Sequence, residues 1–232
     1  IAWVGQESQL PEAYAGLESV DCGGRLVIPG LIDCHTHLCF GGWRGDEFQW
    51  RIEGASYQEI AASGGGIAST VSATRAASPE ELEQKAGKAL DAMLELGITT
   101  VECKSGYGLD YENELKQLEV YQRLDRDHPV DLAPTFLGAH IVPPEYRERR
   151  EDYIRLLCDQ LIPEVAKRGL ARFCDIFIEE GAYTLNEAKT SLGAAADHGL
   201  LLKIHADQLS DGGGALLAAE LGAVSAEHLE YI

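Results

Sequence analysis

A pair of histidines stands at the end of an apolar stretch near the start of this chain. The stretch covers residues 27–38, passes through Pro29 and Gly30, and carries His35 and His37 near its end. Because successive side chains of a strand point to opposite faces, the two imidazoles would emerge on one side, about 6 to 7 Å apart along the strand. Two imidazoles placed this way can share one metal ion. A surface pair, or two hydrogen-bonded core histidines, is the alternative interpretation.

Further side chains with acid–base or ligand chemistry fall where other predicted strands end. They are Tyr107, His140, His205 and His228. Parallel α/β barrels place their chemistry at the carboxyl ends of their strands, so we expect all these residues at one barrel mouth. The two remaining histidines, His128 and His198, stand at predicted helix ends, where the helix dipole accounts for them without a catalytic role.

This set of residues could support hydrolysis by a bound metal ion. A catalytic zinc or iron site commonly has about three protein ligands and a water, and His35, His37 and His205 could supply three nitrogens. Such an ion lowers the pKa of its water to roughly 7 and polarises a carbonyl, as hydrolysis of an amide near neutral pH requires. His228 or His140 could donate a proton or a hydrogen bond. For His205, a buried histidine bonded to the backbone is the alternative.

The end of the fourth predicted strand favours one metal ion over two. Glu179 and Glu180 stand there, so that position offers no lysine that could be carbamylated and bridge a second ion. The sequence does not separate zinc from iron, because histidine-rich sites accept both.

The elements that must position these residues alternate between strand and helix. Ser78, Pro79 and two glutamates open one helix with the N-cap, proline and acidic first turn typical of a helix start. Beyond the first strand, the predicted strands cover 98–103, 131–138, 171–178, 200–204 and 223–226, and the main predicted helices 79–96, 110–125, 151–168 and 185–198. The alternation predicts an α/β fold, a (β/α)8 TIM barrel that is incomplete in this chain, with about six barrel strands.

Residues 1–26 do not follow this alternation. Their short segments and turns predict short strands, as part of a small accessory β-domain, and residues 27–232 are assigned to a partial TIM-barrel, metal-dependent hydrolase domain. A barrel of eight strands typically takes ~250 residues and closes only when all its strands are present. We therefore expect the 232 residues to be a piece of a longer protein.

Composition and charge narrow the range of partners. Hydrophobic residues make up 45% and charged residues 25% of the chain, which is typical of a globular protein with a substantial core. A formal net charge of −19 repels nucleic acid and anionic membranes, so we expect neither as a partner, and an acidic substrate would need local cations. No apolar run is long enough for a membrane span and no basic signal-peptide start is present, so a cytoplasmic location is expected.

Four segments taken together resemble the imidazolonepropionases, a family of the amidohydrolase superfamily. The segments are 29–37, 104–108, 138–140 and 203–207. The similarity extends from about residue 1 to residue 232, and its most specific part is the Lys-Ser-Gly-Tyr-Gly loop at 104–108 together with residues 40–44. The resemblance implies an enzyme of histidine degradation that hydrolyses the cyclic amide 4-imidazolone-5-propanoate to N-formimidoyl-L-glutamate.

The resemblance also implies roles for single residues. Its metal ligands fall on His35, His37 and His205, its catalytic histidine on His228, and its substrate contacts on Arg44, Tyr57, Tyr107 and His140. An arginine fork and a tyrosine hydroxyl suit a propanoate tail inside an otherwise acidic protein. The alternatives are a surface ion pair of Arg44 with Asp46 or Glu47, and a core position for Tyr57.

The chain departs from the family pattern at two places. Gln208 stands where some family members carry glutamate, so a carboxylate role cannot be transferred there, although the amide can still hydrogen-bond a ring nitrogen. The family's fourth metal ligand, an aspartate after the last barrel strand, has no counterpart in these 232 residues. We therefore expect this polypeptide by itself to be poorly active or inactive.

Two other functions remain alternatives. Another amidohydrolase, such as a nucleobase-type deaminase, would use the same histidines, but such enzymes commonly place a glutamate where Gln208 stands. A non-catalytic metal-binding or interaction fragment is the second alternative. The expected partner is a small-molecule substrate, and a homodimer is compatible with the sequence.

Overall fold

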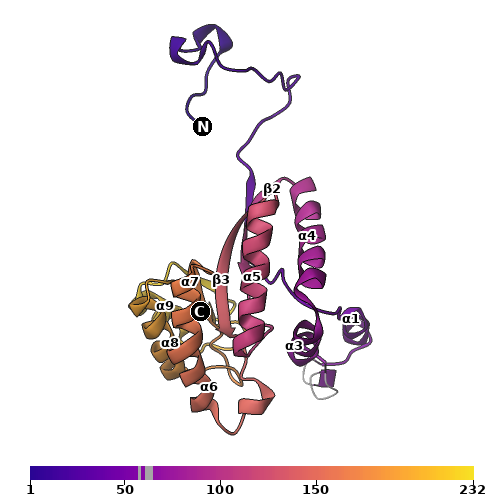
Figure 1. The fold of residues 1–232 in the computed structure, drawn as a ribbon, viewed down its shortest axis with the longest axis vertical. Coiled ribbons are helices and arrows are strands. Elements are labelled where there is room, and N and C mark those ends of the chain that lie inside the picture. The colour runs from indigo at the N-terminus through magenta and orange to yellow at the C-terminus, as the bar shows by residue number, and fades with distance from the viewer. Residues whose placement is uncertain (57–58, 61–64) are drawn as a thin grey trace.

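Six parallel strands form one sheet in chain order, β1-β2-β3-β4-β5-β6, in the computed structural model. The model describes residues 1–56, 59–60 and 65–232, so Tyr57 lies outside the described residues. The strands are β1 Leu31–Thr36, β2 Ile98–Lys104, β3 Asp131–Ala139, β4 Phe173–Ile176, β5 Leu201–Ala206 and β6 Ser225–His228. The sheet is curled and helices cover its outer side (Figure 1). The predicted partial barrel of six strands is confirmed.

The helices connect successive strands, as the alternation in the sequence predicted. Their bounds are α1 Gly45–Ile52, α3 Ile67–Ala76, α4 Pro79–Glu95, α5 Tyr111–Asp127, α6 Arg150–Leu156, α7 Ile162–Arg168, α8 Leu185–Asp197 and α9 Gly214–Leu221. Helix α4 begins with a capping box between Ser78 and Glu81, which satisfies backbone groups at both residues. Within the described part of the chain, no helix has both the length and the hydropathy that a membrane crossing needs.

The predicted helix 151–168 is in fact interrupted. A single π-helical turn, η4 Leu157–Leu161, separates α6 from α7. Pro163 stands at the start of α7 and has no backbone N–H, so it cannot donate to the carbonyl of Asp159. The π turn accommodates this missing hydrogen bond without ending the helical path.

Strand side chains alternate between an outer apolar layer and an inner polar one. In β2, Val101 and Cys103 join the main hydrophobic cluster, whereas Glu102 and Lys104 make buried ion pairs. In β5, Ile204 joins the same apolar cluster, and its neighbours along the strand are polar and buried. The period of two along each strand therefore separates packing residues from the residues that fill the curved inner side.

The segment before β1 differs from the expected short strands. It forms two single turns of 3-10 helix, η1 Glu7–Gln9 and η2 Glu12–Tyr14, and no strand lies in residues 1–30. Figure 1 shows it reaching away from the barrel. Apolar side chains on it, such as Val20 and Leu26, are exposed. A strand needs a partner for its backbone N–H and C=O groups, and no other described segment pairs with this one. The accessory β-domain over 1–26 stays a prediction.

Candidate active site

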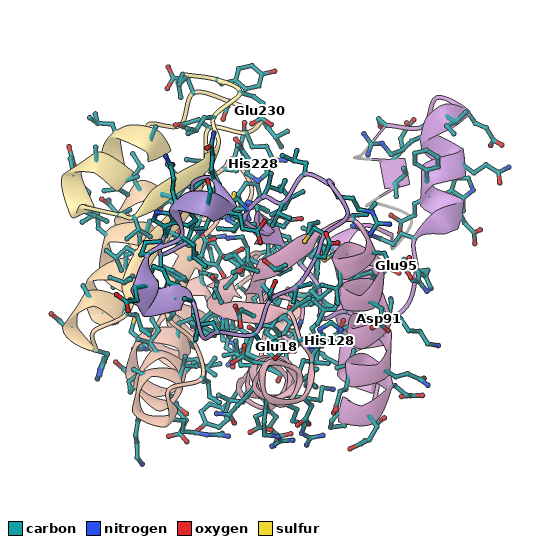
Figure 2. All side chains as sticks on the ribbon, turned by 90° about the horizontal axis from the view of Figure 1, so that it is seen from above. Glu18, Asp91, Glu95, His128, His228 and Glu230 are labelled. Atoms are coloured by element: carbon teal, nitrogen blue, oxygen red, sulfur yellow. The ribbon has the colours of Figure 1, made fainter. Side chains whose placement is uncertain are left out.

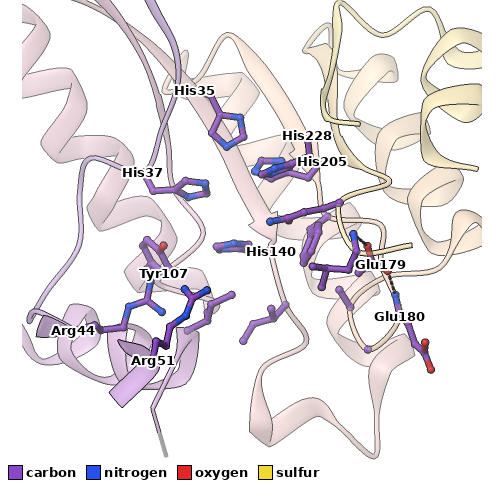
Figure 3. A pocket seen from close by; sticks show the side chains of 17 residues that line it. His35, His37, Arg44, Arg51, Tyr107, His140, Glu179, Glu180, His205 and His228 are labelled. Carbon is purple, nitrogen blue, oxygen red and sulfur yellow. Dashed lines mark hydrogen bonds between the residues drawn. The ribbon is translucent and has the colours of Figure 1, made fainter. Parts of the chain in front are cut away.

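The strand ends carry the predicted site residues to one cavity of about 680 Å³. Its lining includes His35, His37, Arg44, Tyr107, His140, His205, Gln208 and His228 (Figure 3). These residues come from segments more than 190 positions apart in the sequence. Tyr57, the remaining predicted substrate contact, lies outside the described residues.

Three imidazoles meet at the centre of this cavity. The ring centroids of His35 and His205 lie 4.6 Å apart, and those of His37 lie 5.5 Å from His35 and 5.6 Å from His205. Buried Nδ1 of His37 and buried Nε2 of His205 have no hydrogen-bond partner. Imidazole nitrogens are donors that a zinc or iron ion takes. The three nitrogens that lie within 4.8 Å of one another belong to His35, His205 and His228, and His37 is not in that group.

His228 belongs to the same cluster. Nitrogens of His35, His205 and His228 lie within 4.8 Å of one another, so these three residues are spaced closely enough to share one ion. Burial and the neighbouring His205 and His35 lower the pKa of His228. The residue has a φ of 80°, in the left-handed region that favours glycine. Figure 3 shows its side chain next to that of His205, at the same cavity.

Two carboxylates, the buried Asp175 and the partly buried Glu227, contact two of the imidazoles. Nδ1 of His35 lies 2.6 Å from Oε2 of Glu227, and Nδ1 of His205 lies 2.9 Å from Oδ2 of Asp175. Each carboxylate fixes one ring nitrogen and leaves Nε2 on the other side of the ring for the cavity. Sequence reasoning missed both acids. The available signals were a charged residue inside the apolar strand that contains Asp175, and the position of Glu227 directly before His228.

Two lysines complete this buried charge cluster. Lys104 Nζ lies 2.8 Å from oxygens of Glu102, Asp175 and Glu227, and Lys203 pairs with Glu102 and Glu227. Burial by itself would lower the pKa of Lys104, but attraction to the three carboxylates outweighs it and raises the pKa. Lys104 therefore carries a positive charge and is not available as a neutral metal ligand.

His140 and Tyr107 form the next part of the wall. The rings of His37 and His140 are stacked with centroids 5.0 Å apart, and Tyr107 lies 5.3 Å from His140. Burial, with a smaller contribution from His205, lowers the pKa of His140 to about 4. His140 is therefore neutral at physiological pH and can exchange hydrogen bonds with a ring-shaped ligand without carrying charge.

Helix α5 holds the Tyr107 loop through three polar side chains on one face. Buried Glu114 accepts hydrogen bonds from the N–H groups of Gly106, Gly108 and Leu109, at 2.8 to 3.1 Å. Gln117 accepts from the N–H of Tyr107, and the hydroxyl of Tyr121 donates to the carbonyl of Lys104. Residues three and seven positions apart share a helix face, so this stripe was visible in the sequence, but its function there was not.

Two arginines from the α1 region reach the same cavity. Figure 3 shows the guanidinium groups of Arg44 and Arg51 beside Tyr107. The surface ion pair considered for Arg44 is long, with 3.9 Å between Nη1 and Oε2 of Glu47, so the guanidinium keeps most of its hydrogen-bonding capacity. Sequence reasoning missed Arg51, because nothing in the sequence alone shows that it lies two turns from Arg44 on the cavity side.

The remaining histidines lie elsewhere, as the sequence indicated. His128 ends α5 and its Nε2 lies 3.3 Å from Asp91, and His198 ends α8. Figure 2 shows His128 beside Asp91, well apart from His228 and Glu230. At the end of the fourth strand, Glu179 and Glu180 both line the cavity. Glu179 accepts a hydrogen bond from the N–H of Leu209, and the carboxylate of Glu180 points outward (Figure 3).

Histidines, a tyrosine and arginines at the carboxyl ends of a curled parallel sheet have the arrangement typical of the α/β-barrel class of enzymes. The particular family follows from the sequence match. The chain belongs to the amidohydrolase family, whose model matches residues 26–232.

Curated relatives carry one common name. The chain is 51% identical over 212 residues to the imidazolonepropionase of Clostridium tetani, covering 91% of this chain and 51% of the relative. It is 53% identical over 234 residues to that of Myxococcus xanthus, covering 100% of this chain and 56% of the relative. The chain therefore spans about half the length of the curated relatives it matches, and the resemblance inferred from its motifs is confirmed.

Solved structures show the same fold at low sequence identity. The 5-methylcytosine deaminase of Klebsiella pneumoniae, liganded with 5-fluorocytosine, matches with a TM-score of 0.60 at 19% identity, over 89% of this chain and 48% of that chain. The guanine deaminase of C. acetobutylicum, with bound guanine, matches with a TM-score of 0.57 at 13% identity, over 94% and 52%. At such identities the likeness shows the barrel fold alone.

Proposed function

We propose that this chain serves in the metal-dependent hydrolysis of 4-imidazolone-5-propanoate to N-formimidoyl-L-glutamate, as an imidazolonepropionase. The observation that carries the proposal is one cavity that joins a histidine cluster to a pair of arginines. The first suits hydrolysis of a ring amide, and the second suits a carboxylate tail. Relatives with this name at about 50% identity support it.

His35, His37 and His205 would hold one zinc or iron ion. When bound, that ion polarises the amide carbonyl and lowers the pKa of a coordinated water. The unpartnered nitrogens in the cluster support this assignment, and the protonated Lys104, which is paired with Asp175 beside it, argues against a second ion. The carboxylates of Asp175 and Glu227 would keep two of the three imidazoles in the orientation that ligation needs.

The substrate's propanoate would bind Arg44, Arg51 and the hydroxyl of Tyr107. Two guanidinium groups give a local positive region in a chain with a net charge of −19. The imidazolone ring would then lie between the arginines and the histidine cluster, against His140. Gln208 lines the same cavity and can hydrogen-bond a ring nitrogen. A contact from Tyr57 stays a prediction.

His228 would move the proton. Water adds to the amide carbon and the ring C–N bond breaks. One proton of the water goes to the departing nitrogen, and the other is released when the new carboxylic acid ionises to a carboxylate. A neutral His228, with its lowered pKa, can accept a proton from the attacking water and return it to that nitrogen. The cytoplasmic location, the homodimer and the lack of nucleic-acid binding stay predictions.

The test is decay of imidazolonepropanoate on addition of the protein encoded by the complete gene, with a panel of nucleobases assayed beside it. We expect loss of imidazolonepropanoate alone, since Gln208 stands where nucleobase deaminases commonly use glutamate. Ammonia release from a nucleobase would favour a deaminase. No turnover by metal-loaded protein would contradict the proposed substrate.

A further inference from the structure

Lys104 is a buried cation at the centre of the acids that support the histidine cluster. Its side chain is 0% exposed, and its three nearest carboxylate oxygens, from Glu102, Asp175 and Glu227, all lie 2.8 Å from Nζ. An ammonium has three N–H groups and no acceptor, so one donor is available for each acid. Two of the acids are those that contact the imidazoles of His35 and His205.

We propose that Lys104 is a positioning residue for the metal site. By holding Asp175 and Glu227, it fixes the acceptors for Nδ1 of His205 and His35 and so directs both Nε2 atoms into the cavity. The proposal rests on the metal site of the proposed function. Without the ammonium, three buried carboxylates would repel one another and turn away from the imidazoles or take up protons.

The two histidines depend on Lys104 to different degrees. Glu227 also pairs with Lys203, so the acid beside His35 keeps one cation when Lys104 is absent. Among the described residues, Lys104 is the only lysine or arginine that forms an ion pair with Asp175. His205 should therefore lose its orientation first.

Lys104 also links the metal site to the substrate loop. It ends β2, and its backbone carbonyl accepts the hydrogen bond from Tyr121 that anchors the loop carrying Tyr107. One residue thus sets the imidazole orientation through its side chain and the start of the substrate loop through its backbone. A substitution that keeps the backbone separates these two roles.

The experiment compares Lys104→Met/Glu102→Gln with Glu102→Gln alone, in the protein from the complete gene. Glu102 contacts both lysines and Thr135 but no histidine, and the double variant loses one positive and one negative charge. The net charge of the cluster is therefore unchanged, which limits unfolding. The matched control is Lys116→Met, because Lys116 donates to the carbonyls of Thr74, Arg75 and Ala77, away from the cavity.

The readout is the Zn²⁺ dissociation constant, measured by competition with a chelator, with circular dichroism to check folding. We expect binding about 10- to 100-fold weaker in the double variant than in Glu102→Gln, and unchanged binding in Lys116→Met. Binding by the double variant within twofold of Glu102→Gln would overturn the proposal. If the wild-type protein binds no Zn²⁺, the proposed function itself fails, so the two failures are distinguishable.

A second measurement needs no variant that must fold without Lys104. Long-range ¹H–¹⁵N correlation spectra of the zinc-loaded wild-type protein report which ring nitrogen of each histidine carries its proton. We expect the proton on Nδ1 in both His35 and His205, facing the carboxylates that Lys104 holds. A proton on Nε2 of His205 would overturn the proposal.

Discussion

Nδ1 of His140 lies 2.9 Å from the carbonyl oxygen of Gly106, and this contact sets the tautomer of the histidine. A carbonyl only accepts hydrogen bonds, so the neutral ring must carry its proton on Nδ1 and present Nε2 as an acceptor. Gly106 has a φ of 100°, and an added Cβ would lie 2.8 Å from the carbonyl oxygen of Leu137. The glycine thus permits the backbone turn that fixes His140.

The pH dependence of the reaction should contain no contribution from His140 above about pH 5, because burial and His205 lower its pKa to about 4. The measurement is kcat/KM for imidazolonepropanoate between pH 5 and 9, in the wild-type protein and in His140→Asn. We expect the acidic limb to have the same midpoint in both. A limb near pH 6.5 that disappears in the variant would contradict the lowered pKa.

The metal-free protein should lose stability as the pH falls from about 7 to 4. The pKa of His140 is lowered in the folded state, so between these values the unfolded chain binds more protons and unfolding becomes easier. The shift corresponds to on the order of 3 kcal/mol. Urea titrations at several pH values measure it, and the slope with pH should be shallower in His140→Asn, which has no group to titrate.

Removal of one imidazole should abolish metal retention. His35→Ala takes away one nitrogen of the cluster and also leaves Glu227 without its histidine partner. We expect the metal content after dialysis to fall from about one ion per chain to near zero. His128→Ala is the control, since that histidine pairs with Asp91 outside the cavity. Metal content unchanged in His35→Ala would remove this residue from the ligand set.

Loss of either arginine should weaken substrate binding more than turnover. Arg44→Ala and Arg51→Ala each remove from the cavity one charged hydrogen-bond donor to the propanoate. Because a hydrogen bond to a charged group is lost, we expect KM to rise about 10- to 100-fold. Arg126→Ala is the control, because Arg126 pairs with Asp127 at an exposed position. An unchanged KM in Arg51→Ala would mean that Arg44 and Tyr107 suffice for the propanoate.

Glu114→Gln should loosen the loop that carries Tyr107. In the wild-type protein, three backbone N–H groups donate to the carboxylate of Glu114. In the variant, an amide NH2 would replace one acceptor oxygen and face these donors, which should lower the free energy of unfolding by about 1 to 3 kcal/mol. KM should rise with it. Glu112→Gln, on the exposed face of α5, is the control. A variant as stable as the control, with an unchanged KM, would show that the loop holds its shape without Glu114.

The sequence by itself determined the order of the elements and the positions of the histidines along the strands. Alternating strand and helix patterns predicted β2, β3 and α5 within a few residues of their bounds, because hydrophobic period and capping residues act locally. The rule that parallel barrels work at their carboxyl ends then brought His35 and His205 together. Local signals did not predict the π turn that interrupts the helix over 151–168, close to Pro163. They also wrongly predicted strands before β1, where that segment has no strand to pair with.

Only the tertiary structure decided which acids, lysines and arginines join those histidines. Asp175, Glu227 and Lys104 lie on three different strands, and their meeting depends on the register and curl of the sheet, which no local pattern specifies. The same holds for Arg51, whose reach into the cavity depends on how α1 packs. The position of a residue within its strand determines which face its side chain takes. The distance between side chains on different strands depends on the packing of the whole barrel.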